Sequence, residues 1–395
     1  MTATTALDLD WILECTACGA TRTPDGLPGV CACGEPWLVR YPHRAQTIVD
    51  RTELRRRSSM WRFRSWLPIM PGEEPISLGE GDTPLVHARR AGGALGFSDL
   101  WIKDESANPT GSFKARGLSA AVTRAAAAGA EGFVLPTAGN AGVAAAAYGA
   151  RAGLPVRVYA PRSTPATILT QMRTFGADLV LVDGHIGDCG KATRAYAAET
   201  GHVDLSTLRE PYRIEGKKTL GLEVAMAFNW TLPDAVVYPT GGGTGLIGMW
   251  KAFNELLGAG WVTGALPRMY SVQAAGCAPV VRAVEAGASR CDAWDAPWTL
   301  ASGLRVPAPL GGRLMLEAIA ASGGGAVAVP DELLAQLAAD VSRTEGIDIS
   351  PEGGAALAGA GLLRETGAID ADERVIVFNT GAGWLYRPAA ELPRG

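Results

Sequence analysis

The sequence has no long hydrophobic run, no strong excess of charge and no recognisable leader segment. No stretch approaches the about 18 uninterrupted apolar residues of a membrane-spanning helix, so we expect no membrane partner. The 36 basic and 40 acidic residues leave a net charge of −4, which gives no electrostatic reason to expect nucleic acid as a partner. Residues 1–10 lack a basic start followed by an apolar core, so we expect no signal peptide.

Cysteine is scarce, and its distribution argues against a regular disulfide framework. The seven cysteines are an odd number, and four of them crowd into the N-terminal segment as Cys15, Cys18, Cys31 and Cys33. Thiols placed in this way fit a reducing cytoplasm, where we expect the protein to be located. Hydrophobic residues make up 47% of the 395 and charged residues 19%. This balance is typical of a globular protein, and the length of 395 residues fits two or three domains.

Short apolar strands alternate with helices from residue 70 onward. We expect strands at 100–103, 132–136, 156–160, 178–182, 235–238 and 375–378. We expect helices at 112–128, 140–152, 167–175 and 246–257. The alternation indicates an α/β fold with two open, twisted, mostly parallel sheets that helices cover on both faces. The arginine-rich stretch 51–64 is expected to be a solvated helix or arm, with a phosphate or nucleic-acid patch as the alternative.

Glycine-rich or polar turns follow three of these strands, after Leu135, Tyr238 and Phe378. Because ligands gather at the carboxyl ends of parallel strands, we expect these turns to line one crevice. The turn after Tyr238 opens a helix and contains Gly241, Gly242, Gly243, Thr244 and Gly245. Its backbone N–H groups suit an anion such as a cofactor phosphate. The alternative is a turn that only allows strand and helix to pack tightly.

Three further polar residues suit parts of a cofactor, and each has a simpler alternative. Lys114 lies near the start of a helix, where partial burial and backbone dipoles would lower its pKa and leave a neutral amine able to attack an aldehyde; a lone lysine is more often solvated. Asn140 could hydrogen-bond a phenolic oxygen or simply cap its helix. Thr380 could face a pyridine nitrogen or belong to a plain strand-end turn.

Together, and in this order, these segments resemble those of the fold-type-II pyridoxal-phosphate enzymes and, among them, of the threonine synthases. The segments that carry the resemblance are 79–85 (GEGDTPL), 103–114 (KDESANPTGSFK), 138–140 (AGN), 211–219 (PYRIEGKKT), 241–245 (GGGTG), 345–353 (EGIDISPEG) and 380–381 (TG). The resemblance extends from about Cys15 to Tyr386, which is nearly the whole chain.

The resemblance implies a pyridoxal-phosphate cofactor and assigns residues to it. Lys114 would carry the cofactor as a Schiff base, with Phe113 beside it. The turn 241–245 would bind the cofactor phosphate, Asn140 its hydroxyl and Thr380 its pyridine nitrogen. The loop assigned to the substrate carboxylate contains Thr137, Ala138, Gly139 and Ala141.

The resemblance also implies a lyase of amino-acid biosynthesis that converts O-phospho-L-homoserine and water to L-threonine and phosphate. Arg213 would bind the substrate phosphate; the alternative is a salt bridge from Arg213 to Glu210 or Glu215. The better-known synthases have a threonine where this chain has Ala141, and asparagines in the phosphate loop where it has Gly243 and Thr244. These departures leave open a threonine or serine dehydratase, or an enzyme that replaces a β- or γ-substituent.

Residues 1–45 are expected to form a separate module. Some threonine synthases open with a small zinc-ribbon-like module, and the resemblance implies a structural zinc on Cys15, Cys18, Cys31 and Cys33. The Cys-x-Cys half is tighter than the usual ribbon pair, so metal-free cysteines in a packed module are the alternative. Residues 46–114 and 216–395 would form the arm and the large cofactor domain, and 115–215 a small mobile α/β domain. Family likeness implies a homodimer.

Overall fold

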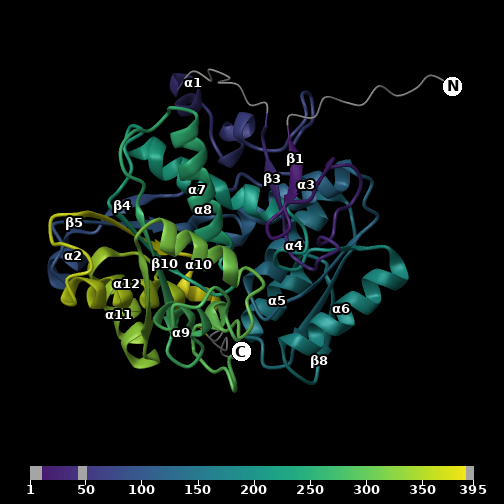
Figure 1. The fold of residues 1–395 in the computed structure, drawn as a ribbon. Helices are drawn as coiled ribbons and strands as arrows, with labels where there is room; N and C mark the ends of the chain where they lie inside the picture. The colour runs from purple at the N-terminus through teal and green to yellow at the C-terminus, as the bar shows by residue number, and fades with distance from the viewer. Residues whose placement is uncertain (1–10, 43–50, 388–395) are drawn as a thin grey trace, which may run out of the picture.

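We describe a computed structural model that covers residues 11–42 and 51–387 (Figure 1). The described residues form three sheets, of which the first is small, antiparallel and N-terminal. Its order is β2-β1-β3, with β1 (Ile12–Cys15), β2 (Thr21–Arg22) and β3 (Trp37–Arg40). The core of this module is continuous with the core around Phe133 and Tyr148, because Trp11 and Leu13 pack in the same hydrophobic cluster as these two residues.

The largest sheet has six strands in the order β12-β11-β10-β13-β5-β4. They are β4 (Leu85–His87), β5 (Asp99–Asp104), β10 (Ala235–Pro239), β11 (Arg268–Ala274), β12 (Gly325–Val329) and β13 (Arg374–Asn379). Neighbouring strands are parallel, except that β4 pairs antiparallel with β5. Strand β13 lies in the middle, between β10 and β5, and its Val-Ile-Val-Phe run is fully buried, as expected of a strand covered on both faces.

The third sheet has four parallel strands in the order β8-β7-β6-β9. They are β6 (Phe133–Pro136), β7 (Val156–Pro161), β8 (Asp178–Val182) and β9 (Val203–Asp204). All four strands fall within 115–215, the range predicted for a small domain. The division into domains and the mobility of this part stay predictions.

Helices flank the two larger sheets. The α-helices of the described residues are α1 (Arg51–Arg56), α2 (Arg89–Leu95), α3 (Lys114–Ala127), α4 (Asn140–Ala152), α5 (Ala166–Thr174), α6 (Ile186–Thr200), α7 (Tyr212–Ala227), α8 (Thr244–Gly258), α9 (Pro279–Glu285), α10 (Gly312–Ala321), α11 (Asp331–Glu345) and α12 (Pro351–Glu365). The short 3-10 helices are η1 (Met60–Trp66), η2 (Glu105–Ala107), η3 (Ser302–Leu304) and η4 (Gly383–Leu385).

Three helices begin at residues other than the predicted ones: α5 begins one residue early, at Ala166, and α3 and α8 differ by two residues for local reasons. Helix α3 begins at Lys114, two residues later than predicted, because Ser112 forms a bridge with Gly381 and is held outside the helix. Helix α8 begins at Thr244, two residues earlier than predicted. Its N-cap is Gly243, whose φ of 75° allows the chain to turn sharply into the helix.

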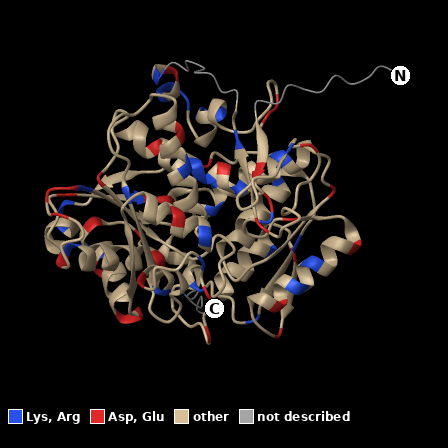
Figure 2. Cartoon of the chain, in the orientation of Figure 1, with Lys and Arg blue, Asp and Glu red and all other residues tan. Residues whose placement is uncertain are grey.

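Charge is spread over the molecule. Figure 2 shows basic and acidic residues interspersed along both lobes. In the arginine-rich stretch, Arg55, Arg56 and Arg57 are exposed, as predicted for a solvated helix, but Arg62 is buried and pairs with Asp82 at 2.6 Å. Among the described residues no helix is both long enough and apolar enough to cross a membrane.

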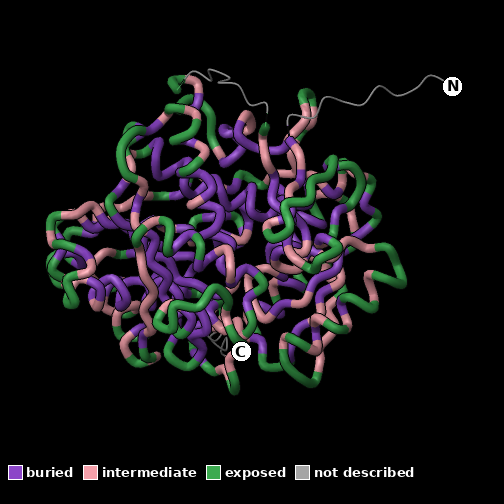
Figure 3. Tube along the Cα trace, in the orientation of Figure 1, coloured by how far each residue is buried: buried purple, intermediate pink, exposed green. Residues whose placement is uncertain are grey.

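Helix α7 runs through the interior of the molecule. All of its residues from Tyr212 to Met226 are buried (Figure 3), and it packs against both α3 and α8. A helix buried on all sides needs no apolar stripe, but every charge that it carries must be compensated inside the protein. The charges of α7 therefore bear on the site described next.

Candidate active site

Two of the three turns predicted to share a crevice are in contact. Asn140 lies in the turn after β6, and Gly381 in the turn after β13. A Cβ added to Gly381 would be 3.2 Å from Asn140 Nδ2. The same Nδ2 donates to the hydroxyl of Tyr386 at 3.3 Å. The ends of β6 and β13 therefore meet, although they belong to different sheets.

The third turn, after β10, reaches the first through η3. A Cβ added to Gly241 would collide with the backbone of Gly303, and one added to Gly139 would be 4.0 Å from Ser302 Oγ. Glu352, in the first turn of α12, holds η3 because its Oε1 accepts from the N–H of Gly303 at 2.8 Å. The turns after β6 and β10 thus both approach η3, and the turn after β13 joins them through Asn140.

Lys114 is tied to the end of β13 through the residue before it. The N–H of Phe113 donates to the carbonyl of Thr380 at 3.0 Å, and Lys114 Nζ lies 4.0 Å from the centroid of the Phe113 ring. The pKa of Lys114 is lowered to about 7, first by burial and then by the positive charge of Arg213, while the negative charge of Glu352 partly offsets both. An amine with this pKa can act as a nucleophile towards an aldehyde near neutral pH.

The glycine turn 241–245 is needed for packing and also presents hydrogen-bond donors that can bind an anion. A Cβ added to Gly243 would collide with Met315, and one added to Gly245 with the Tyr238 hydroxyl. The packing alternative is therefore part of the explanation. However, the first N–H groups of α8 have no acceptor inside the helix, so the turn also offers hydrogen-bond donors to an anion at a helix N-terminus.

Asn140 is not the cap of its helix. The N-cap of α4 is Gly139, and no side-chain oxygen among the described residues caps it, so the capping alternative is wrong. Thr137 fixes the turn instead, because its Oγ1 accepts from the N–H of Gly139 at 3.1 Å. Ala138 and Ala141 complete the loop with small, half-buried side chains. The side chain of Asn140 is left free to face the turn after β13.

Several buried polar atoms around these turns lack a hydrogen-bond partner within the described chain. They are Thr110 Oγ1, Ser112 Oγ, Asn140 Oδ1 and Tyr238 Oη. Buried polar atoms in folded proteins are nearly always paired, so this group indicates room for a polar molecule. The residues fit pyridoxal phosphate. This cofactor needs an amine for its aldehyde, hydrogen-bond donors for its phosphate, an amide for its phenolic oxygen and a partner for its ring nitrogen.

Arg213 is buried on α7 and only partly satisfied. Its Nη1 donates to the carbonyl of Leu205 at 2.6 Å, and its Nε has no partner. The alternative salt bridge is not observed among residues 11–42 and 51–387. Glu210 instead accepts from the backbone N–H of Arg213 at 3.1 Å, and Glu215 pairs with Lys218 at 2.7 Å. The guanidinium is therefore available to a ligand.

Four residues near the site were not assigned a role from the sequence. Glu352 stands in the 345–353 segment, and Lys217 in the 211–219 segment. Both therefore lie in motifs that carry the family resemblance, and these motifs could have pointed to them. Ser302 and Tyr386 lie outside every motif and could not have been found in that way. Burial raises the pKa of Glu352, and burial together with that carboxylate raises the pKa of Tyr386.

The four N-terminal cysteines converge at one point. The Sγ atoms of Cys15 and Cys33 are 3.4 Å apart, those of Cys18 and Cys31 are 3.7 Å apart, and all four lie within 4.8 Å of one another. Four thiolates placed tetrahedrally at about 2.3 Å around zinc would be separated by about 3.8 Å. The cluster can therefore hold a metal such as zinc, as predicted, and the short Cys-x-Cys spacing does not prevent it.

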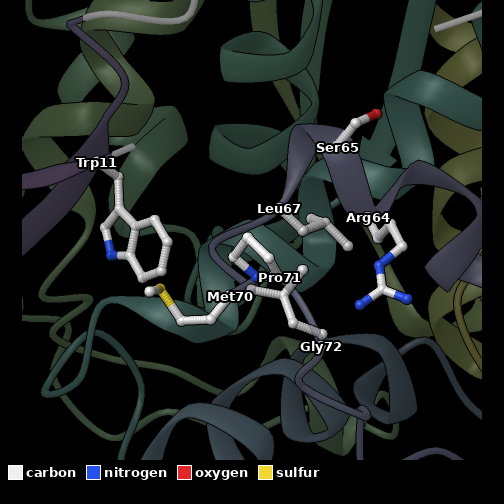
Figure 4. A pocket seen from close by; sticks show the side chains of 8 residues that line it. Trp11, Arg64, Ser65, Leu67, Met70, Pro71 and Gly72 are labelled. Atoms are coloured by element: carbon white, nitrogen blue, oxygen red, sulfur yellow. The ribbon is translucent and has the colours of Figure 1, made fainter. Parts of the chain in front are cut away.

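A separate cavity of about 310 Å³ lies where the N-terminal module meets the segment after η1 (Figure 4). It is lined by Trp11, Arg64, Ser65, Leu67, Ile69, Met70, Pro71 and Gly72. None of the predicted site residues lines it, so it is distinct from the site built by the three turns.

Comparison with known proteins gives consistent results. A family model described as "Pyridoxal-phosphate dependent enzyme" matches residues 76–381. The chain is 35% identical to the threonine synthase of Methanocaldococcus jannaschii over 382 residues, which cover 96% of this chain and 94% of that protein. It is 33% identical to the threonine synthase of Mycobacterium tuberculosis over 322 residues, which cover 81% and 86%.

Solved structures are similar in fold. Maize serine racemase superposes with a TM-score of 0.66 at 22% identity, covering 76% of this chain and 88% of that one. The processed form of threonine deaminase isoform 2 from Solanum lycopersicum superposes with a TM-score of 0.64 at 22% identity, covering 76% and 83%. These similarities confirm the predicted α/β fold class.

Proposed function

The chain belongs to the family of pyridoxal-phosphate-dependent enzymes, as its motifs predicted, and from this premise we propose that it is a threonine synthase. Its cofactor is pyridoxal phosphate, it is a lyase, and it acts on a small amino acid. The proposed reaction converts O-phospho-L-homoserine and water to L-threonine and phosphate. The observation that carries the proposal is the buried guanidinium of Arg213, whose Nε has no hydrogen-bond partner and whose positive charge acts on Lys114.

The residues that would hold the cofactor follow from the geometry of the turns. Lys114 would hold its aldehyde carbon, with Phe113 alongside. The turn of Gly241, Gly242, Gly243, Thr244 and Gly245 would bind its phosphate, Asn140 its phenolic oxygen and Thr380 its ring nitrogen. When bound, the cofactor supplies a sink for the electrons of the substrate's α-carbon.

Lys114 would also transfer protons. A side chain whose pKa is about 7 is well matched to take a proton and return it near neutral pH. Nζ of Lys114 would take the proton from the α-carbon of the substrate and later return one there. We assign the proton at the β-carbon to Lys114 as well.

The substrate would be held at its two charged ends. The N–H groups at the start of α4, in the loop of Thr137, Ala138, Gly139 and Ala141, would bind its carboxylate. Arg213 would bind its phosphate through a guanidinium that can make two parallel hydrogen bonds. Closure of the 115–215 part on the substrate would exclude water until it is needed at the β-carbon.

The proposal is tested by incubating the holoenzyme with O-phospho-L-homoserine and measuring phosphate and threonine. Both products should appear in equal amounts. If neither forms, the assignment is wrong. An Arg213→Gln variant should lose most activity on this substrate, because a neutral amide cannot grip the phosphate.

A second candidate is favoured by Ala141 and by the Gly243-Thr244 form of the phosphate turn. Under it, the same lysine and cofactor site would deaminate threonine or serine, or replace a β- or γ-substituent. A panel of threonine, serine and acetylated homoserine discriminates between the candidates, because only the dehydratase releases ammonia and a 2-oxo acid.

We further propose that the enzyme works as a homodimer in the cytoplasm. The free thiols of all seven cysteines fit a reducing compartment. Size-exclusion chromatography with light scattering measures the oligomeric state, and a monomeric mass would contradict the dimer.

A further inference from the structure

Helix α7 carries five buried charged residues, and two of them have no partner of opposite charge. Three form ion pairs, namely Glu215 with Lys218 at 2.7 Å and Glu223 with Lys103 at 2.8 Å. Arg213 and Lys217 form none within the described part of the chain, although both are almost completely buried. Leaving a charge buried and unpaired costs several kcal/mol. These two residues therefore require an explanation that the other charges of α7 do not.

The amines of Lys217 and Lys114 both lie close to the ring of Phe113. Lys217 Nζ donates to the backbone carbonyl of Phe113 and lies 4.2 Å from the centroid of the Phe113 ring, while Lys114 Nζ lies 4.0 Å from the same centroid. Gly117 makes room for this arrangement, because a Cβ there would be only 3.1 Å from Lys217 Nζ. The absence of a side chain at Gly117 thus allows Lys217 to reach the start of α3.

Arg213 and Lys217 belong to the same face of α7. They are four residues apart, and side chains at this spacing project from one side of a helix. The same Gly117 Cβ would be 3.0 Å from the carbonyl of Arg213, so this face of α7 packs closely on the first turn of α3. Both side chains are therefore directed to the region where Lys114 begins its helix.

Three cationic side chains converge here, and none of them forms an ion pair among the described residues, although the carboxylate of Glu352 acts on Lys114 and those of Glu210 and Asp204 act on Arg213. Apart from burial, the pKa of Lys217 is lowered by the positive charges of Lys114, Arg213 and Arg116. The carboxylate that acts on Lys217 is that of Glu105, and it is already bound by Arg116 at 2.6 Å. An arrangement of this kind is stable only if the lysine gives up its proton or an anion enters.

We propose that Lys217 and Arg213 together form a binding site for a phosphate monoester dianion, and that Lys217 is a specificity-determining residue for the phosphorylated substrate. The inference rests on the proposed function in that it takes the dianion to be that of O-phospho-L-homoserine. Lys217 is neutral and donates to the Phe113 carbonyl when the site is empty. It becomes an ammonium when the dianion binds, because the opposite charge favours the protonated form.

The test uses the holoenzyme, with inorganic phosphate as the probe. Lys217→Gln keeps a hydrogen-bond donor for the Phe113 carbonyl and removes the ability to become charged. Lys217→Met removes both and serves as the second variant. Lys191→Gln is the matched control, because Lys191 is exposed on α6. We expect the Kd of phosphate to rise about tenfold to hundredfold in both Lys217 variants, as for the loss of a charge-assisted hydrogen bond, and to stay unchanged in the control.

Calorimetry of the unaltered holoenzyme gives a second reading that needs no variant. Phosphate is titrated at pH 8 in two buffers of different ionisation enthalpy. The difference in heat should report uptake of protons on binding, because Lys217 gains one while phosphate is already a dianion. Binding without proton uptake would overturn the inference, even if neither Lys217 variant folds.

The remaining outcomes separate this inference from the proposed function. If phosphate binding depends on Lys217 but no threonine forms from O-phospho-L-homoserine, the site stands and the synthase assignment fails. If threonine forms, and Lys217→Gln changes neither phosphate affinity nor the KM for the phosphorylated substrate, the inference is wrong. It is also wrong if the variant weakens retention of pyridoxal phosphate alone, since Lys217 would then serve the cofactor.

Discussion

The lowered pKa of Lys114 makes a prediction about how the apoenzyme takes up its cofactor. With a pKa of about 7 in place of 10.5, about half of the Lys114 side chains are neutral at pH 7. At the ordinary pKa only about one in three thousand would be. Since only the neutral amine attacks an aldehyde, the rate of reconstitution with pyridoxal phosphate should rise with pH up to about 7 and become level above about pH 8.

The assay mixes apoenzyme with an excess of pyridoxal phosphate at a series of pH values and follows the absorbance of the bound cofactor. Two variants give opposite shifts of the midpoint. Arg213→Gln removes a positive charge that lowers the pKa of Lys114, so its midpoint should move up. Glu352→Gln removes a negative charge that raises it, so its midpoint should move down. Both shifts should be smaller than the effect of burial, which is the largest cause.

A rate that keeps rising about tenfold per pH unit up to pH 10 would show that Lys114 titrates as a solvated lysine, and the reasoning from burial would be refuted. Shifts of the two variants in the same direction would refute the electrostatic attribution. The exposed Lys191→Gln variant should follow the unaltered protein throughout.

Three further predictions concern stability and metal. Gly245→Ala places a methyl group against the Tyr238 hydroxyl and should destabilise the protein by about 1–3 kcal/mol and weaken cofactor retention; unchanged denaturant unfolding and cofactor titration would contradict this. Leu220→Ala, at a fully buried position of α7, should cost about 2–5 kcal/mol, and a loss below about 1 kcal/mol in the same unfolding assay would mean that α7 is loosely packed. Cys31→Ser should abolish stoichiometric zinc, measured by elemental analysis of the purified protein, and a full complement of zinc in this variant would exclude the cluster as its site.

Local sequence pattern was sufficient for six of the strands and four of the α-helices, because their signal is local; the other strands and α-helices of the described residues, α7 among them, were not predicted with bounds. The strand at 178–182 and the helix at 140–152 were predicted with the bounds that the structure has. The start of α3 was misplaced by two residues, because Ser112 is held by Gly381. A pairing between residues so far apart in the chain leaves no trace in the local pattern.

The site shows the same limit. Lys114 and Asn140 stand in recognisable segments, so they could be named in advance. Tyr386 contacts Asn140 only because β13 ends beside β6, and Lys217 reaches Phe113 only because residue 117 is a glycine on a neighbouring helix. The contacts of such residues depend on how separate helices and strands pack together. The amino-acid pattern of a single helix or strand does not specify this packing.

The position of β13 has a consequence for how the protein is made in the cell. The strand joins β5 to β10 in the middle of the largest sheet, yet it is the last strand of the described chain to leave the ribosome. At about 5–20 residues per second, translation from the end of β5 at Asp104 to the start of β13 at Arg374 takes about 14 to 54 s. During that time β5 presents an unpaired edge to other chains, and β10 does so from the synthesis of Pro239 onward. A chain that stops before Arg374 would therefore be a client for chaperones rather than a smaller enzyme.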